Sequence, residues 1–596
     1  MDPREPTHFN VLVAGTGLQE SILAAALAKA GYSVLQLDSA PYYGTEHASL
    51  SLSELHDWAR EERRRASTSS RRLPDSLARI SQRFALSLEP MILRAQGPGL
   101  DLLVRSRVAS YLQFGLVGGV GLFQSDAAPP SSQPEPRRQG RVKRVPASKS
   151  DVFTDQTLSL VEKRRLTKLL LFAAGQDPLE HDPVLQAGKS PARLHHLGPK
   201  GFSLSGTIAD SLAYALALCT CPSDPALPAL ERIRNIIHAV GRYGPSPYLV
   251  GHYGGAGDLV GGFSRICAVW GGGQILGRQI LPLELDPEVG PSVPPSQPPF
   301  STPETQPPPP AHAQAGTAPS SESSRDGDEG PTRVTTRPLG IPVRLEEAAA
   351  ATPTVFTGDW VVSSPHLFST LFPSHPTPPP ALQEPRKNKS KTAHLIAILT
   401  DPIPFPPRAS ASLDESEPPS DEPDSHLFVF PPETCHPDVA SVTALQTGKG
   451  TMSCPEGYHV LYLTGSLLDS ARARTELPDA RSLLEPYLEA LLALPVPSSN
   501  TTPTASTTPI YSVAYWSPKP TTVPSSTSTS PSSSPELPLN LLVTPPLACA
   551  SQSSSLIETL DEVVPSAEAL FWKVVGEEGR KEGVQFFAKE ERVDDE

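Results

Sequence analysis

The sequence lacks the marks of several large classes of protein. It has only 6 cysteines in 596 residues, and only Cys219 and Cys221 lie close together, so no zinc site is predicted. No apolar run reaches the ~18 residues that a membrane-spanning helix needs. The polar start, MDPREPTHFN, predicts no signal peptide. The formal net charge of −14 argues against a nucleic-acid-binding protein, and we expect reduced thiols and a cytoplasmic location.

Proline, by contrast, is abundant. The chain has 70 prolines, and segments rich in Pro and Ser alternate with segments that have apolar periodicity. The sequence therefore predicts an α/β core built from both ends of the chain and interrupted by unstructured tracts. The expected units are 8–123, 228–283 and 346–575 (three parts of one α/β domain), 141–222 (an inserted small all-α domain), 284–345 (a disordered insert), disordered loops near 373–390, 402–425 and 496–536, and 576–596 (an acidic tail).

Residues 11–38, VLVAGTGLQESILAAALAKAGYSVLQLD, predict a strand, a glycine turn, a helix and a second strand. Gly15 and Gly17 allow the tight turn of a dinucleotide-binding unit, and Asp38 lies about 20 residues on, where a ribose ligand is expected. Glu20, however, takes the place of the third small residue. A carboxylate in the first turn of this helix would occupy or repel the phosphate that the turn normally binds.

Two interpretations stay open at this point. The first interpretation, an FAD-dependent oxidoreductase, is supported by residues 9–38 alone. It requires a second contact to the cofactor, for which Thr357-Gly358-Asp359 is the candidate. The second interpretation is that Gly15, Gly17 and Glu20 form a vestigial nucleotide-binding turn, which requires no cofactor. Short strands are also predicted at 353–364, 393–401, 426–432, 457–465, 510–516 and 539–546.

Two blocks resemble a known family. Residues 9–55, with Gly-Thr-Gly-Leu, then Glu20, then Asp38 followed by Tyr42-Tyr43-Gly44, are similar to the opening block of the Rab GDP-dissociation inhibitor and Rab escort protein superfamily. Residues 242–276, RYGPSPYLVGHYGGAGDLVGGFSRICAVWGGGQIL, resemble its second homology region. The resemblance implies a GDI-type α/β fold similar to that of FAD- and NAD(P)-binding enzymes, with no bound cofactor and no catalytic residues.

Within this superfamily the chain is more similar to the escort branch, also called component A of Rab geranylgeranyltransferase. Residues 141–172 and 561–575 resemble escort segments, and the inserts between core strands are typical of that branch. The resemblance implies capture of GDP-bound Rab GTPases and presentation of their C-terminal cysteines to the geranylgeranyltransferase α/β heterodimer. Delivery of the prenylated Rab to membranes would follow, with transient peripheral association. A recycling Rab GDP-dissociation inhibitor remains the alternative.

The resemblance also implies site residues. Matched motif by motif, the Rab-binding platform comprises Tyr43, Asp258, Arg265 and Ile275, with Asp258 standing where the family usually has Glu. Arg265 could donate two hydrogen bonds to a carboxylate of the partner, and Tyr43 offers a rigid contact with a polar tip.

The helical domain is the expected place for the geranylgeranyl chain. Burial of each methylene is worth about 0.8 kcal/mol, so an apolar groove between helices would hold such a lipid. The candidate residues follow helical spacing: Leu158, Val161, Leu169, Phe172, Ile208, Leu212 and Ala215. The alternative is that these side chains form the core of a small helical bundle.

Overall fold

A computed structural model describes most of the chain. The described residues are 6–65, 69–70, 72–126, 140–146, 149–175, 204, 206–283, 338–345, 352–373, 391–407, 423–468, 471, 477–495, 508–518, 538–545, 547 and 555–588.

The first sheet combines segments from both ends of the chain. Its strands, in spatial order, are β11 (Gly273–Ile275), β2 (Val34–Leu37), β1 (His8–Ala14), β14 (Thr354–Ser363), β13 (Leu339–Arg344) and β12 (Gln279–Ile280), with β20 (Leu541–Val543) also paired to β14. β1 is parallel to both β2 and β14, and His8 lies opposite Thr357. This sheet therefore forms only after residues about 350 positions apart have met.

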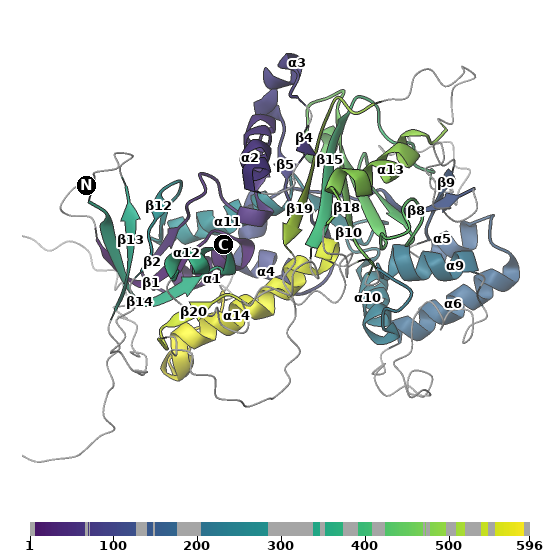
Figure 1. Cartoon of the computed structure of the whole chain (residues 1–596). Helices are drawn as coiled ribbons and strands as arrows, with labels where there is room; N and C mark the ends of the chain where they lie inside the picture. The colour runs from purple at the N-terminus through teal and green to yellow at the C-terminus, as the bar shows by residue number, and fades with distance from the viewer. Residues whose placement is uncertain are drawn as a thin grey trace, which may run out of the picture.

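Helix α1 (Leu18–Lys29) lies behind this sheet and is buried along its whole length from Leu18 to Ala28. It packs against α11 (Ala256–Val269) and α14 (Ser555–Lys581). Its alanines carry small side chains, which let two helices approach closely. Helices α4 (Pro98–Ser106) and α12 (Pro365–Leu371) complete the helices of this domain, and Figure 1 shows α14 in yellow running below α1 and α4.

The second sheet lies beside the first in Figure 1 and has eight strands. In spatial order they are β4 (Ser69–Ser70), β19 (Tyr511–Pro518), β15 (Lys391–Leu399), β18 (His459–Ser466), β17 (Val442–Thr447), β16 (His426–Phe430), β8 (Gly119–Ser125) and β9 (Gly140–Arg144). Helix α13 (Ala480–Leu492) packs on β15, β18 and β19, and α2 (Leu52–Arg65) packs near β19 and β4. The expected strands at 353–364, 393–401, 426–432, 457–465, 510–516 and 539–546 are confirmed as β14, β15, β16, β18, β19 and β20.

Short elements join the two sheets. They are β3 (Ser49–Leu50), β5 (Leu86–Ser87), β6 (Ile92–Arg94), β7 (Phe114–Leu116), β10 (Tyr248–Gly251), α3 (Asp75–Ala78), η1 (Thr45–His47), η2 (Ser81–Arg83), η3 (Val108–Tyr111) and η7 (Lys449–Thr451). β10 is the central strand of a three-stranded sheet, between β6 and β7.

The helical region contains α5 (Lys149–Thr154), α6 (Leu160–Ala174), α9 (Gly206–Asp210), the π-helix η5 (Ser211–Leu216) and α10 (Ala226–Ala239). Ser159 and Glu162 form a capping box that starts α6, because each side chain binds the other residue's backbone N–H. In Figure 1 these helices lie below the second sheet, on the side away from β1.

Two of the domain boundaries expected around the helical region differ from those in the structure. Residues 140–144 form β9, which pairs with β8 in the second sheet, although the helical domain was expected to begin at 141. Helix α10 packs against α6, although 228–283 was expected to belong to the α/β domain. The physical reason is that α10 has a buried apolar face, including Ile233 and Ile236, which needs another helix to cover it.

Three expected unstructured segments are also shorter in the structure. β13 lies inside the expected insert 284–345, and β19 lies inside the expected loop 496–536. Ile403 is buried within 402–425. The expected acidic tail begins too early, because Phe586 and Phe587 are buried against the core that contains Phe263. The remaining parts of these expected segments, 284–337, 374–390, 408–422, 496–507, 519–537 and 589–596, lie outside the described residues.

Candidate functional site

The glycine turn joins β1 to α1 and has little free space. Gly15 has φ +117°, a conformation that favours glycine, and a Cβ there would lie 2.8 Å from Oγ of Ser364. Gly17 is the N-cap of α1. The turn is therefore closed on one side by Ser364, which follows β14 directly.

Glu20 fills the other side of the turn. Its side chain is buried, and its Oε1 accepts a 2.6 Å hydrogen bond from Oγ1 of Thr544. Burial, with a further contribution from the Glu46 carboxylate, raises the pKa of Glu20 from 4.5 to about 7. A buried carboxyl group thus lies in the first turn of α1, where a phosphate would need the helix N-terminus.

Asp38, the expected ribose ligand, is also used internally. Its Oδ2 accepts hydrogen bonds from the backbone N–H and the hydroxyl of Thr16, at 2.9 and 2.6 Å. Its Oδ1 accepts one from the backbone N–H of Ala40, at 2.9 Å. With Asp38 engaged and Glu20 in the turn, these residues do not fit a dinucleotide.

The candidate second contact to a flavin is wrongly placed. Thr357, Gly358 and Asp359 lie within β14, where Gly358 pairs with Phe9. Asp359 accepts a hydrogen bond from Asn10 and lies 3.5 Å from Nε2 of His8, at the start of β1. The glycine turn follows the end of β1, so the two motifs lie at opposite ends of the parallel strands.

The platform residues lie on segments that hydrogen bonds join. The hydroxyl of Tyr43 lies 3.5 Å from Oε1 of Gln274, and Nε2 of Gln274 donates a 2.9 Å hydrogen bond to the carbonyl of Ser264. Ile275 accepts a 3.0 Å backbone hydrogen bond from Asp38. The two blocks that carry the family resemblance therefore meet at the edge formed by β2 and β11.

Arg265 follows Ser264 on α11 and is exposed. Its guanidinium lies over the ring of Tyr111, 4.4 Å from the centroid, at cation–π distance. Asp258 lies seven residues earlier, in the first turn of the same helix, so both side chains belong to one helix face. Partial burial raises the pKa of Asp258 from 3.8 to about 6.

Sequence reasoning missed the exposed aromatic and apolar side chains on and beside α11. Tyr111, Val269 and Trp270 are exposed, with Trp270 ending α11 and Lys29 lying 5.9 Å from its ring. Trp270 stands inside the second homology block, so that block contained a signal for it. Tyr111 has no such signal, because η3 approaches α11 only through tertiary packing.

The candidate groove residues do not all meet. Leu169, Ile208, Leu212 and Ala215 are buried in one hydrophobic core, and Leu158 and Phe172 pack against that core. Val161 is 55% exposed and is not part of this core, so its place in the candidate groove stays a prediction. At 100° per residue, Val161 lies about 80° around the helix from Leu169 but only about 20° from Phe172. The structure thus presents these side chains, Val161 excepted, as a packed core.

Metal ligands and membrane spans were also expected to be absent. Among the described residues, no group of three or more His, Cys, Asp or Glu side chains could hold a metal ion. In that part of the chain, no helix is long and apolar enough to cross a membrane.

Comparisons with known proteins agree with the sequence blocks. Residues 5–291 match the family model described as GDP dissociation inhibitor. Two proteins named "Rab proteins geranylgeranyltransferase component A" are 32% identical: that of Drosophila melanogaster over 301 residues (47% of this chain, 55% of that protein) and that of Saccharomyces cerevisiae over 273 residues (45% and 42%). The Rab GDP-dissociation inhibitor of Saccharomyces cerevisiae is 30% identical over 275 residues (45% and 56%). The matches thus span about half the length of these relatives.

The fold has a solved counterpart. A crystal structure of the Rab GDI from Plasmodium falciparum superposes with a TM-score of 0.57 at 19% identity, covering 95% of this chain and 98% of that one. The GDI-type α/β fold is confirmed, as is the resemblance carried by residues 9–55 and 242–276.

Proposed function

We propose that this chain, whose residues 5–291 match the GDP dissociation inhibitor family, is a Rab escort protein. It captures GDP-bound Rab GTPases and presents their C-terminal cysteines to the Rab geranylgeranyltransferase α/β heterodimer. It then holds the prenylated Rab in solution until delivery to a membrane. Because its platform favours the GDP form of the Rab, binding slows nucleotide release.

One structural relationship carries this proposal. Tyr43 from the first homology block and Gln274 from the second approach to 3.5 Å, and Gln274 binds the carbonyl next to Arg265. Segments about 200 residues apart in sequence thereby build one surface with an exposed guanidinium and neighbouring aromatic rings. Tyrosine, tryptophan and arginine are the residue types that most often dominate binding energy at protein interfaces.

The closed glycine turn supports a non-catalytic role. A flavin would need the space that Glu20 occupies and a second contact that Asp359 is too far away to supply. The chain would therefore act as the accessory component of the transferase. An FAD-dependent oxidoreductase is the less favoured function, and flavin absorbance of the purified protein would establish it.

The escort branch is preferred to the recycling inhibitor. The relatives named component A are 32% identical, against 30% for the inhibitor, and residues 141–172 and 561–575 resemble the escort version. The lipid site is proposed in the helical region. Since Leu169, Ile208 and Leu212 lie in one packed core, lipid binding there requires these side chains to move apart.

The test is reconstituted prenylation of a purified Rab by the transferase heterodimer, with and without this chain. Incorporation of labelled geranylgeranyl should depend on the chain, which is not itself modified. If incorporation is the same in its absence, the escort function is wrong. Extraction of prenylated Rab from vesicles by the same preparation would then identify a recycling inhibitor.

A further inference from the structure

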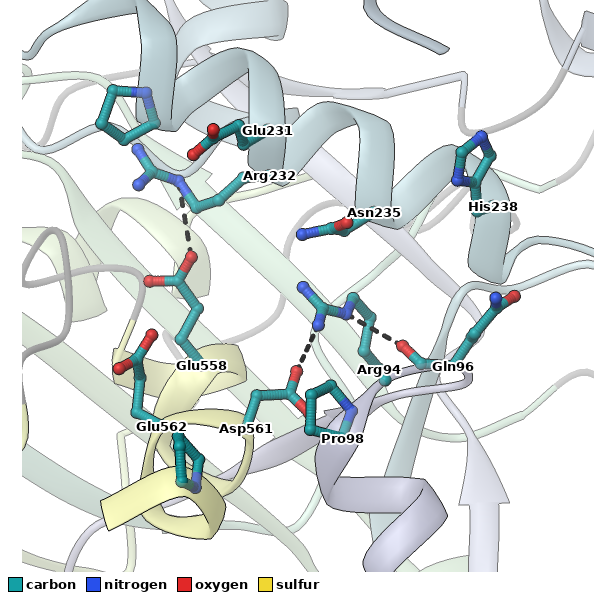
Figure 2. A pocket seen from close by; sticks show the side chains of 13 residues that line it. Arg94, Gln96, Pro98, Glu231, Arg232, Asn235, His238, Glu558, Asp561 and Glu562 are labelled. Carbon is teal, nitrogen blue, oxygen red and sulfur yellow. Dashed lines mark hydrogen bonds and ion pairs between the residues drawn. The ribbon is translucent and has the colours of Figure 1, made fainter. Parts of the chain in front are cut away.

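A cavity of about 540 Å³ lies where three distant parts of the chain meet. It is lined by residues from three segments: 94–98, which run from the end of β6 to the start of α4, 228–238 of α10, and 558–565 of α14. Its size is within the range of small-molecule sites, about 300–1,000 Å³. Figure 2 shows charged side chains from all three segments pointing toward one another across this space.

In one half of the cavity, the charged side chains are paired with one another. Asp561 pairs with Arg94, with 2.5 Å between Oδ2 and Nη2, and its Oδ1 accepts a 2.8 Å hydrogen bond from the backbone N–H of Gly99. Nε of Arg94 donates to the carbonyl of Gln96 at 3.0 Å. These groups satisfy one another and need no ligand.

In the other half of the cavity, the carboxylates outnumber the positively charged side chains. Glu558 is only 8% exposed, yet its Oε2 has no hydrogen-bond partner. Its Oε1 lies 3.9 Å from Nε of Arg232, beyond hydrogen-bond distance, because that Nε donates a 2.6 Å bond to the carbonyl of Ala217 instead. A buried carboxylate oxygen without a donor is costly, so this group favours a ligand that supplies one.

Glu562 lies one turn after Glu558 on α14 and is half buried. Burial raises its pKa, and the neighbouring carboxylates of Glu558 and Asp561 raise it further. From α10, Glu231 and Asn235 also line the cavity, again one turn apart. The lining has four carboxylates against two guanidinium groups, a formal excess of two negative charges.

We propose that this half of the cavity binds an organic cation, with an ammonium or guanidinium group held between Glu558 and Glu562. Glu231 adds negative charge from the facing helix, and Asn235 offers an amide oxygen. Such a group supplies several N–H donors at once, which satisfies the orphan oxygen of Glu558 and the charge of Glu562 together. A free polyamine and a basic peptide side chain both carry this chemistry. The site lies apart from the Rab platform, and the inference does not rest on the proposed function.

The test is calorimetric titration of the full chain, at low ionic strength and neutral pH, with spermidine and with N-acetylargininamide. N-acetylcitrullinamide is the matched neutral probe. We expect saturable binding of at least one cation and none of the citrulline compound. Tighter binding of spermidine identifies a polyamine site, and tighter binding of the arginine compound a peptide side-chain site.

Variants separate this site from general attraction to an acidic protein. Glu562→Gln and Glu558→Gln should each weaken binding about tenfold or more. Glu577→Gln is the control, because Glu577 is exposed on the same helix and its side chain faces Arg580. Glu562 is half buried, so its variant is expected to fold even if Glu558→Gln does not. Absence of saturable binding up to about 10 mM, or equal binding by Glu562→Gln and Glu577→Gln, overturns the inference.

Discussion

Oγ1 of Thr544 donates a 2.6 Å hydrogen bond to Oε1 of Glu20, although the two residues are 524 positions apart in the chain. Thr544 follows β20, whose pairing with β14 brings it beside the glycine turn. The far end of the chain thus closes a turn that the first 20 residues begin.

The buried carboxyl of Glu20 predicts a pH dependence of stability. Its pKa is about 7 in the folded chain and near 4.5 when exposed, so the folded state binds more protons between these values. The free energy of unfolding should therefore fall as pH rises from about 4.5 through 7, by about 3 kcal/mol from this group. Glu20→Gln removes the titration and keeps an acceptor for Thr544. Denaturant unfolding at pH 5 to 8 should show the variant gaining stability relative to the parent as pH rises.

Glu46→Gln tests what raises the pKa of Glu20. The Glu46 carboxylate is the second contribution to the raised pKa of Glu20, and its side chain is exposed. Its removal should lower the pKa of Glu20, which makes the loss of unfolding free energy with rising pH smaller without abolishing it. A parent and a Glu20→Gln variant with identical pH profiles would contradict the buried position of this carboxyl.

Gly15→Ala should destabilise the chain more than Gly31→Ala. Both glycines have positive φ, +117° and +90°, so each substitution carries backbone strain of about 1–2 kcal/mol. A Cβ added at Gly31 would have no atom within 4 Å, whereas a Cβ at Gly15 would meet Ser364. Ser364 cannot move freely, because it caps α12. Thermal unfolding of the two variants checks the difference, and equal losses would show that the turn has room.

Arg265→Ala should weaken capture of a GDP-bound Rab by about tenfold, since arginine at the centre of an interface often contributes more than about 1 kcal/mol. Stability should change little, because Arg265 is exposed and, among the residues that the structure describes, its contact with Tyr111 is a surface cation–π contact. Titration of a fluorescently labelled Rab measures the affinity. Arg79→Ala, at the exposed end of α3, is the control and should bind normally. Equal affinity of both variants would remove Arg265 from the platform.

Asp561→Ala should cost about 3–5 kcal/mol of unfolding free energy, because it leaves the buried guanidinium of Arg94 without its partner. It also removes the acceptor of the Gly99 N–H. The double variant Arg94→Met and Asp561→Leu should recover part of the loss, since no buried charge remains. Denaturant unfolding of Arg94→Met, Asp561→Leu and the double variant measures this coupling. Strictly additive losses would show that the pair does not interact.

The sequence predicted the βαβ unit and the two homology blocks because these depend on local features. A continuous apolar run with β-branched residues, two glycines and a helix rich in alanine define residues 11–38 without reference to the rest of the chain. Strands β14, β15, β16, β18, β19 and β20 were also predicted, because β-branched residues stand between Pro- and Ser-rich segments, whereas β17 was not predicted. The exposure of Val161 was not predicted, because helical periodicity predicts a stripe of apolar side chains but not which neighbouring elements cover it.

By itself, the sequence determined that Glu20 would stand in the first turn of α1 and that Tyr43 and Arg265 would lie in family blocks. Only the tertiary structure decided that Thr544 binds Glu20, that Tyr111 lies under Arg265 and that Asp359 lies at the wrong end of β1. Local spacing fixes neighbours within a helix or strand. Which distant segments pair, however, depends on the sum of packing and hydrogen bonds over the whole chain, and no single segment contains that information.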